Sequence, residues 1–267
     1  MWFPAAARIA AAYAVFSLAW IIIGDRMANE ASPAQPTRLT IEDAKGSLFV
    51  LLSSLLIYVL VARHQAHRRR SLSEQQAVYD ETLLGWAAAL DLRDHSTAEH
   101  TARVTELATR LAASLGFEGR ALELVKRGAT LHDIGKMGVP DEILRKQGPL
   151  TDEEWVQMRR HPELAVQFLN GIAHLRESLD IPWCHHERWD GTGYPRGLAG
   201  TDIPLSARIF SVIDVYDAVT SERPYRQPLD HAAAMVLVHE GSGTQFDPDV
   251  VTAFEALPLP GRHSHHV

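Results

Sequence analysis

The sequence has 267 residues, of which 46% are hydrophobic, and this is enough for one sizeable domain and a smaller second part. Residues 1–70 have a surplus of four basic residues and the remainder has a deficit of eleven, so the main part is acidic, unlike a domain that binds nucleic-acid polymers. The single cysteine, Cys184, excludes an internal disulfide and is expected to be a small buried residue.

Two apolar stretches near the start predict membrane-spanning helices. Residues 4–24 contain one charge, Arg8, and would form about 30 Å of helix, which is enough to cross a bilayer. Residues 46–62 contain no charge and are at the short end of the usual range. The first stretch lacks the basic start and the small-residue cleavage site of a signal peptide, so we prefer a membrane span to that alternative.

A cluster of arginines follows the second stretch, in the segment RHQAHRRR at residues 63–70, and predicts its orientation. Loops rich in Lys and Arg stay on the cytoplasmic side of a membrane. We therefore expect a multi-pass protein of the lipid bilayer with both ends inside the cell. Residues 25–45 are then expected to form a short external loop.

Residues 71–92 predict a linker helix. Apolar side chains recur there at steps of seven, four, three and four residues, at Leu72, Tyr79, Leu83, Trp86 and Leu90. Two interpretations of this seam stay open. It packs on the domain that follows, or it forms the stalk of a parallel homodimer below the membrane.

The remainder, to about residue 258, predicts an all-α domain, because we find no convincing strand alternation. The segments STAE at 96–99 and TDEE at 151–154 have the pattern of capping boxes that open helices. Three glycines stand where the glycine after a helix is expected: Gly116, Gly135 and Gly171. Residues 259–267 are expected to be a disordered tail.

Seven side chains that can bind metals fall at the ends and breaks of the predicted helices or inside an apolar one. They are His100, His132, Asp133, His161, His185, His186 and Asp214. Each alone fits an ordinary core or surface role, and Asp214 could instead pair with Arg208 or Arg223. An aspartate in an apolar helix is costly unless it is paired or binds a metal. Together the seven supply the nitrogen and oxygen ligands of a two-metal site with a bridging carboxylate.

Three long motifs appear in order: HDIGK at 132–136, HHERWDGTGYP at 185–195 and DVYDAVTSERPYR at 214–226. With them, the sequence closely resembles the HD-GYP domains, a branch of the HD metal-dependent phosphohydrolases. The resemblance implies a helical HD-superfamily domain over residues 80–258. The segments LAWIIIGDR and KGSLFVLL, at 18–26 and 45–52, resemble a two-helix anchor of bacterial signalling proteins, which implies the inner membrane with the catalytic domain in the cytoplasm.

The resemblance implies hydrolysis of cyclic di-GMP to the linear dinucleotide and, in some members, to GMP. It makes the seven residues the metal ligands, with Asp133 bridging, and it makes His132, Asp133 and Lys136 the catalytic group. Lys136 would bind a phosphate oxygen, and Arg223 and Arg226 would contact the substrate. The loop that would support the site, which is also a proposed docking surface for diguanylate cyclase domains, contains Asp190, Gly191, Gly193, Tyr194 and Pro195.

One position departs from some members of the family. Those members have a glutamate four residues before the histidine that corresponds to His100, and it binds a third metal. Here Ser96 takes that place, so we expect two metals and leave the complete run to GMP open. Imidazole and carboxylate ligands without a clear thiolate favour iron or manganese. Two such cations would attract a phosphate to an acidic domain, and a hydroxide that bridges them is available at neutral pH.

Two other functions stay open. The chain is a hydrolase of another cyclic dinucleotide, such as a cyclic GMP-AMP hybrid, or it is a catalytically weak module that binds cyclic di-GMP or a cyclase partner. Degenerate members usually lose part of the HD pair or of the tandem histidines. This sequence keeps both, which favours the active phosphodiesterase.

Overall fold

The computed structural model describes the chain except for residues 1–4, 31–34, 95–97, 223–226 and 259–267. All regular elements among the described residues are helices, and the only β-type pairing there is an isolated bridge between Ser242 and Phe246. The predicted all-α class is therefore confirmed for this part of the chain. The chain divides into two compact units, residues 1–78 and 79–267.

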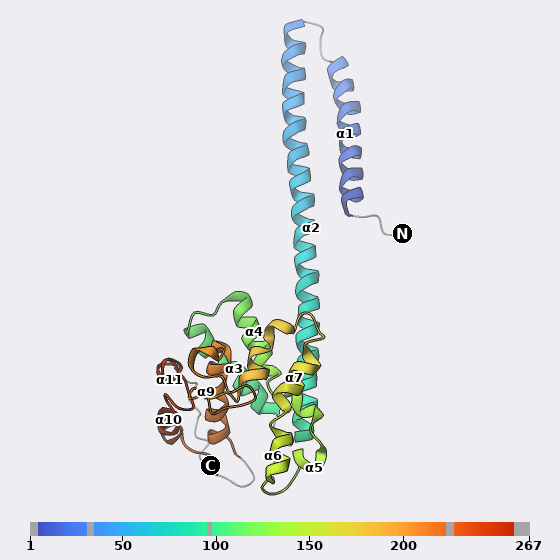
Figure 1. Cartoon of the computed structure of the whole chain (residues 1–267). Coiled ribbons are helices and arrows are strands. Elements are labelled where there is room, and N and C mark those ends of the chain that lie inside the picture. Colours follow the sequence, from blue (N-terminus) through green and yellow to red (C-terminus); the bar gives the residue numbers. More distant parts are fainter. Residues whose placement is uncertain (1–4, 31–34, 95–97, 223–226, 259–267) are drawn as a thin grey trace, which may run out of the picture. The chain divides into compact units, whose positions relative to one another are not determined.

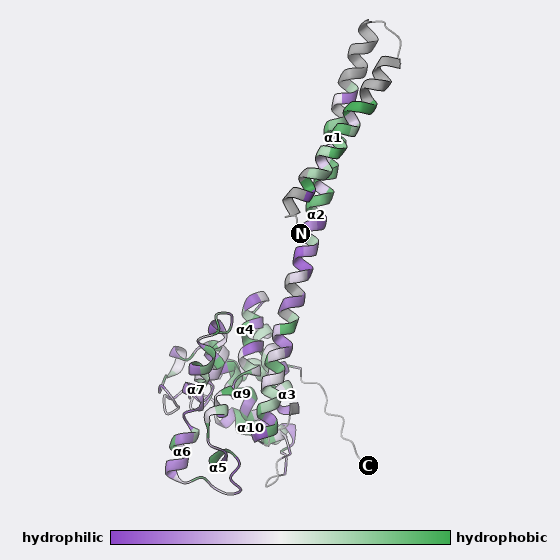
Figure 2. Cartoon of the chain, turned by 90° about the vertical axis from the view of Figure 1, so that its right-hand side faces the viewer, coloured by the Kyte–Doolittle hydropathy of each residue, from purple (hydrophilic) through white to green (hydrophobic). Residues whose placement is uncertain are grey.

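The first unit contains α1 (Ala5–Glu30) and the first part of α2 (Gln35–Asp94), which lie side by side in Figure 1. An aromatic cluster joins them, because the rings of Phe16 and Trp20 on α1 each lie 5.9 Å from the ring of Phe49 on α2. Apolar residues, green in Figure 2, occur along both helices of this unit. Many of these apolar side chains are exposed.

One stretch of the described residues, Ala44–Ser71, is long and apolar enough to cross a membrane by length and composition. On α1 the apolar stretch is shorter, Ala11–Ile23. Of the two predicted spans, only the second therefore coincides with a stretch that meets the length criterion.

The expected external loop at residues 25–45 is wrong in its extent. Helix α1 continues to Glu30 and α2 begins at Gln35, so that only residues 31–34 lie outside both helices, and these are not described. Ala, Met and Glu in the segment MANE favour a helix. Pro36 falls in the first turn of α2, where the missing N–H has no helical acceptor to lose.

The second unit is built around α9 (Leu205–Thr220), which is buried along most of its length. It contacts α3 (Ala98–Ser114), α8 (Asp180–Cys184), α10 (His231–Glu240) and α11 (Pro248–Glu255). A helix that is apolar on nearly all sides needs such neighbours. The remaining elements are α4 (Gly119–Thr130), η1 (Ile134–Gly138), α5 (Asp141–Leu144), α6 (Asp152–Met158), α7 (His161–Leu169), η2 (Arg176–Ser178) and η3 (Gly200–Asp202).

The last part of α2 belongs to the core of the second unit. Leu83 and Leu90 are 4% and 3% exposed, whereas Tyr79 and Trp86 are 53% and 42% exposed. The interpretation that the seam packs on the following domain is therefore confirmed for the two leucines. The side chain of Leu72 is not among those described, and the homodimer stays a hypothesis.

Of the predicted helix signals, those at Thr151 and Gly116 are confirmed, that at Gly135 is wrong, and that at Ser96 is not described. Thr151 forms the capping box with Glu154 that the segment TDEE predicts. Gly116 follows α3 with φ of +88°, as expected for a glycine after a helix. Gly135 does not end a helix, because α4 ends at Thr130 and Gly135 lies within η1. The predicted cap at Ser96 falls outside the described residues.

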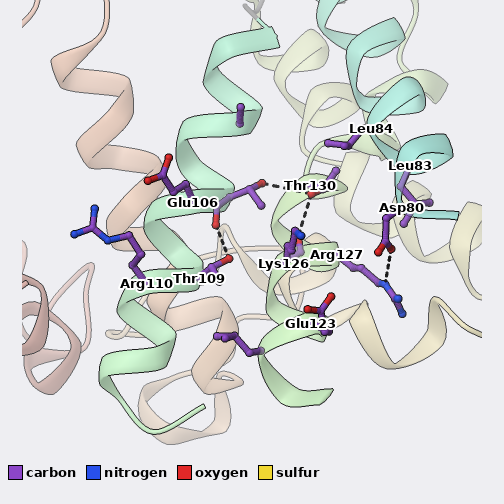
Figure 3. Close-up of a pocket in the computed structure, with 13 residues that line it drawn as sticks. Asp80, Leu83, Leu84, Glu106, Thr109, Arg110, Glu123, Lys126, Arg127 and Thr130 are labelled. Carbon is purple, nitrogen blue, oxygen red and sulfur yellow. Dashed lines mark hydrogen bonds and ion pairs between the residues drawn. The ribbon is translucent and has the colours of Figure 1, made fainter. Parts of the chain in front are cut away.

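A pocket of about 470 Å³ lies between the end of α2, α3 and α4 (Figure 3). Leu83, Leu84 and Leu122 form part of its apolar lining, and the ion pair between Asp80 and Arg127 lies at its edge. None of the seven predicted metal ligands lines this pocket.

Candidate metal centre

The structure gathers six of the seven predicted ligands into two groups. The first group, which we call the His161 group, contains His161, His185 and His186, and the second, the His100 group, contains His100, His132 and Asp214. Within each group the candidate ligand atoms all lie within 4.8 Å of one another. Three ligands of these types leave room for further ligands on a metal ion.

Asp133, the seventh predicted ligand, lies between the two groups. Its Oδ2 is 3.1 Å from Nε2 of His132, in the His100 group. Its Oδ1 is 3.5 Å from Nε2 of His161 and 3.9 Å from Nε2 of His185, in the His161 group. The two oxygens of one carboxylate thus face different groups, as a bridging ligand of two ions requires.

Three histidines are oriented by the backbone of their own segment. The Nδ1 atoms of His132, His161 and His185 lie 2.8–2.9 Å from the carbonyl oxygens of Ala129, Met158 and Ile181, respectively. A hydrogen on Nδ1 donated to a carbonyl leaves the lone pair on Nε2, and this fixes which nitrogen is free for a metal. The Nε2 atoms of His161 and His185 lie 3.3 Å apart, so they converge on one point.

His100 is oriented by a side chain instead. Its Nδ1 is 2.7 Å from Oδ2 of Asp217, which is nearly fully buried on α9. Arg103 donates to both oxygens of Asp217, at 2.7 and 3.0 Å, and also to the hydroxyl of Ser221. Burial opposes ionisation, but hydrogen bonds from His100 and Arg103 keep the pKa of Asp217 well below its usual value.

Asp217 and Arg103 were missed by sequence reasoning. The signal that could have found them is a matched spacing, since His100 and Arg103 are three residues apart on α3 and Asp214 and Asp217 are three apart on α9. Residues at this spacing share one face of a helix. Two such pairs predict a contact only when the packing of α3 against α9 is known.

The histidines of the His161 group are neutral in the metal-free protein. Burial is the main cause that lowers the pKa of all three, and neighbouring imidazoles or Lys136 add to it. For His186 the pKa falls to about 3. A neutral imidazole has the lone pair that a metal needs. This group is therefore ready to bind a cation without first losing protons.

The charges around Asp133 are different. Burial would lower the pKa of His132, but the carboxylate of Asp133 outweighs it and raises this pKa to about 9. Burial would likewise raise the pKa of Asp133, yet Lys136 and His132 hold it well below its usual value. Asp133 is thus a permanent anion with cations on one side, and metal binding would replace the proton of His132.

Apolar packing supports the centre from behind. The ring of Phe210 on α9 lies 4.8 Å from the ring of His132 and 6.0 Å from that of His185.

Asp214 does not pair with Arg208, because Arg208 forms an ion pair with Asp247. Its Oδ1 instead lies 3.8 Å from Nε2 of His100. The carboxylate of Asp214, which lies within the largely apolar helix α9, thus faces His100 of the same group, as expected of a ligand.

The sequence matches the HD domain family over residues 86–250, which is more than half of the chain. The chain belongs to the HD domain family. It is 38% identical over 200 residues to a cyclic di-GMP phosphodiesterase of Vibrio cholerae, covering 69% of this chain and 41% of that protein. It is 43% identical over 166 residues to a cyclic di-GMP phosphodiesterase of Pseudomonas aeruginosa, covering 62% and 40%.

A third relative has a different substrate in its name. The chain is 36% identical over 173 residues to 3'3'-cGAMP-specific phosphodiesterase 2 of Vibrio cholerae, covering 64% of this chain and 33% of that protein. The chain thus spans less than half the length of these relatives. Together these matches support the predicted HD-GYP branch of the HD domain family, and the predicted anchor lies outside the residues that match the family.

Lys136 of the HD domain is held by two carboxylates and by the turn around it. Its Nζ lies 2.8 Å from Oδ2 of Asp133 and 2.7 Å from Oδ2 of Asp94, at the end of α2. Burial opposes its charge, but these carboxylates raise its pKa above the usual value. The neighbouring Arg93 donates to three backbone oxygens of this turn, those of Lys136, Met137 and Val139. Sequence reasoning missed both Arg93 and Asp94.

Close packing explains two glycines of the motifs. A Cβ on Gly135 would lie 1.8 Å from the carbonyl oxygen of His161, so only glycine lets η1 approach the start of α7. A Cβ on Gly193 would lie 2.4 Å from the backbone nitrogen of Arg188 and 2.6 Å from the carbonyl oxygen of His186. Both glycines therefore bring a metal-ligand segment and its neighbour into contact.

The predicted supporting loop lies against the tandem histidines. Tyr194 stacks on His186, with ring centres 4.8 Å apart, and Pro195 follows it through a cis peptide bond. The buried carboxylate of Glu187 accepts hydrogen bonds from the backbone nitrogens of Arg196 and Leu198. At the other end, Asp190 accepts from the nitrogen of Thr192, and Gly191 has φ of +77°. The loop is thus tied to the site segment.

The remaining predicted site residues are not placed. Arg223 and Arg226 fall within residues 223–226, outside the described part, so their contact with the substrate stays a prediction. Docking of a diguanylate cyclase domain on residues 190–195 also stays a prediction.

Cys184 is buried, as expected, and burial raises its pKa to about 11, so its thiol is not a reactive thiolate at neutral pH.

Proposed function

We propose that this HD domain is a metal-dependent phosphodiesterase that cleaves the 3'–5' phosphodiester of cyclic di-GMP to the linear dinucleotide. The observation that carries the proposal is the position of Asp133, with one oxygen facing the His100 group and the other facing the His161 group. Two-metal centres of this kind clamp the attacking and leaving oxygens of a phosphoryl transfer. The relatives named as cyclic di-GMP phosphodiesterases support this substrate.

A pair of divalent ions supplies two things to such a reaction: it lowers the pKa of water, and it neutralises charge that develops on the phosphoryl group. The residues that would hold the ions are the three histidines of the His161 group, the three ligands of the His100 group, and Asp133 between them. Nitrogen and oxygen ligands without a thiolate suit iron or manganese.

Lys136 contributes a fixed positive charge beside the bridging carboxylate. Its pKa is raised, so it stays protonated at every pH at which the enzyme would act. An ammonium group next to the centre can donate a hydrogen bond to a phosphate oxygen and stabilise the added negative charge. Asp94 and Arg93 hold the lysine and its turn in position before the substrate arrives.

The proposal is tested by incubating the purified full-length protein, reconstituted with Mn²⁺ or with Fe²⁺ under anaerobic conditions, with cyclic di-GMP. Chromatography of the products should show the linear dinucleotide, and a later GMP peak would reveal a second cleavage. A chelator should stop the reaction and added metal should restore it. Turnover that survives complete metal removal would overturn the proposal.

A second candidate substrate is cyclic GMP-AMP, because one of the relatives is named for that dinucleotide. Side-by-side measurement of kcat/KM for the two cyclic dinucleotides assigns the preference. Tight binding of cyclic di-GMP without hydrolysis of either dinucleotide would favour the catalytically weak module instead.

We also propose that the first unit anchors the protein in the bacterial inner membrane, with the catalytic domain in the cytoplasm. Supporting this are the apolar stretch Ala44–Ser71 on α2 and the exposed apolar side chains of α1. Arginines at 63, 68, 69 and 70 fit the cytoplasmic end of a span. Cell fractionation tests this, because an anchored protein resists carbonate extraction and dissolves in detergent. Recovery in the soluble fraction would contradict it.

A further inference from the structure

Arg159 lies at the end of α6, two residues before His161. Its guanidinium carbon is 5.4 Å from the ring centre of Tyr194 and 5.8 Å from that of Trp155. Tyr194 in turn stacks on His186, with ring centres 4.8 Å apart and planes inclined by 28°. A continuous row of side chains therefore connects Arg159, through Tyr194, to the His161 group.

Arg159 has no carboxylate partner within the part of the second unit that the structure describes. Six other arginines of this unit each pair with a carboxylate: Arg93, Arg103, Arg120, Arg127, Arg188 and Arg208. The side chain of Arg159 is also exposed, so it can be reached from solution. An accessible cation beside a candidate phosphodiesterase centre is thus left without a protein anion.

The aromatic contacts define what this guanidinium can bind. Rings of tyrosine and tryptophan attract the face of a guanidinium, which leaves the N–H groups at its edge. That edge matches the paired oxygens of a phosphate and binds them with two parallel hydrogen bonds. Since the rings also restrict the side chain, little conformational entropy is lost when such a ligand binds.

A cyclic dinucleotide has two phosphates, and only one of them can lie at the metal centre at a time. Lys136, and the residues that would hold the two ions, would act on the phosphate that is cleaved. We infer that Arg159 binds the second phosphate, the one that is not being cleaved, and so recognises the substrate as a cyclic dinucleotide. This inference rests on the proposed function and adds a residue for binding the substrate.

Arg160 supplies a matched control. It is the next residue, it is also exposed, and no ring contact or ion pair of its side chain is seen among the described residues. Replacing either arginine with alanine changes the net charge by the same amount. A difference between Arg159→Ala and Arg160→Ala therefore reports the position of the cation rather than the overall charge.

The experiment compares the full-length wild type with Arg159→Ala, Arg159→Lys and Arg160→Ala. Each is assayed with cyclic di-GMP and with bis(p-nitrophenyl) phosphate, a chromogenic diester that has one phosphate. Arg159→Ala should lower kcat/KM for cyclic di-GMP by roughly 10- to 100-fold, mainly by raising KM, because one charge-assisted contact is lost. Its activity on the chromogenic diester and its metal content should stay within about twofold of wild type.

The other variants sharpen the result. Arg159→Lys should have an intermediate KM, because lysine keeps the charge but not the planar pair of donors. Arg160→Ala should resemble wild type on both substrates. The inference is overturned if Arg159→Ala loses activity equally on both substrates, if Arg160→Ala shows the same loss, or if Arg159→Ala has an unchanged KM.

Failure of the proposed substrate is a separate result. If the wild type prefers cyclic GMP-AMP, the same comparison is made with that dinucleotide, which also has two phosphates. If the wild type cleaves only the chromogenic diester, the proposed function fails, and calorimetric binding of cyclic di-GMP to the Arg159 and Arg160 variants decides the inference alone. Equal affinity of the two variants for cyclic di-GMP then overturns the inference. Weaker binding by Arg159→Ala, with wild-type affinity in Arg160→Ala, supports the inference.

Discussion

The His161 group and the His100 group are built in different ways. The ligands of the His161 group come from one stretch of the chain, residues 161–186, and two of its histidines are oriented by carbonyl oxygens three or four residues earlier. The ligands of the His100 group come from α3, the end of α4 and α9, and His100 depends on Asp217, which is 117 residues away. The first group is local, and the second exists only after the helices have packed.

The candidate centre should therefore be sensitive to substitutions in two separate parts of the second unit. Changes near α7 and the tandem histidines should disturb one ion, whereas changes between α3 and α9 should disturb the other. Asp133 lies between the two groups and faces both of them, so its loss should affect both ions.

The largest effect is expected for Asp133→Ala. The substitution removes the carboxylate between the two groups and leaves two cations facing each other without an anion. Turnover should be abolished and both ions should bind more weakly, as measured by kinetics and by metal analysis of the same sample. Asp202→Ala, at an exposed position on η3, is the control. Full metal content with wild-type turnover would refute the two-metal assignment.

Gly135→Ala should disturb the His161 group, although residue 135 is not one of its ligands. The new methyl group would lie 1.8 Å from the carbonyl oxygen of His161 and 2.6 Å from the backbone nitrogen of Ala165, and neither backbone atom can swing away. We expect a loss of about 1–3 kcal/mol in the free energy of unfolding, together with weaker binding of one ion. Chemical denaturation and metal titration measure these two effects.

The control for this variant is Gly171→Ala, since a Cβ at Gly171 meets no atom within 4 Å. This control should be nearly as stable and active as the wild type. A Gly135→Ala protein with unchanged stability and metal content would show that η1 and α7 do not need this close contact.

Asp217→Asn should weaken the His100 group alone. The amide keeps the shape of the side chain but loses the charge that orients His100 and pairs with Arg103. Loss of such a supporting carboxylate typically costs 10- to 100-fold in metal affinity. Metal titration should show one site weakened and the other unchanged, with activity restored at high metal concentration. Equal weakening of both sites would contradict the separation of the two groups.

The smallest effect is on the pH dependence of stability without metal. In the folded protein the pKa of His186 is lowered to about 3, while an unfolded chain binds that proton near pH 6.5. Below pH 6.5 the unfolded state therefore binds more protons, so stability falls as the pH falls. His161 and His185 act in the same direction.

His132 acts in the opposite direction, because its pKa is raised to about 9 and its contribution is lost as the pH rises towards that value. His186→Gln should reduce the slope of unfolding free energy between pH 6 and 4.5 by up to about 1.4 kcal/mol per pH unit. Urea denaturation in the presence of a chelator measures it. An unchanged slope would mean that His186 already titrates normally in the folded protein.

Local signals in the sequence predict local features of this chain well. The capping box at Thr151 and the glycine that follows a helix at Gly116 were predicted from neighbouring residues, and both are found. The seven predicted ligands also lie close together, although they come from distant segments. They were predicted from the resemblance to a family, which includes information about tertiary structure that the spacing of residues does not. Their role in binding metal is supported by this geometry and stays a prediction.

Features that depend on packing between distant helices were not predicted. Asp217 and Arg103 look like ordinary charged helix residues until α3 and α9 are in contact. Gly135 has the pattern of a helix end, yet its role is to admit the backbone of His161. The extent of α1 and α2 around residues 25–45 was missed for another reason, since the loop was expected to fill the whole stretch between the two predicted spans, although most residues there tolerate a helix.

The end of α2 has a practical consequence for how the second unit should be produced in isolation. Similarity to the HD domain family begins at residue 86, but the compact unit begins at Tyr79. A protein cut at the homology boundary would lose Leu83 from its core and the ion pair of Asp80 with Arg127. The limit of sequence similarity and the limit of the folding unit are thus one to two helical turns apart, and a cut at the former would leave a buried apolar surface open to water.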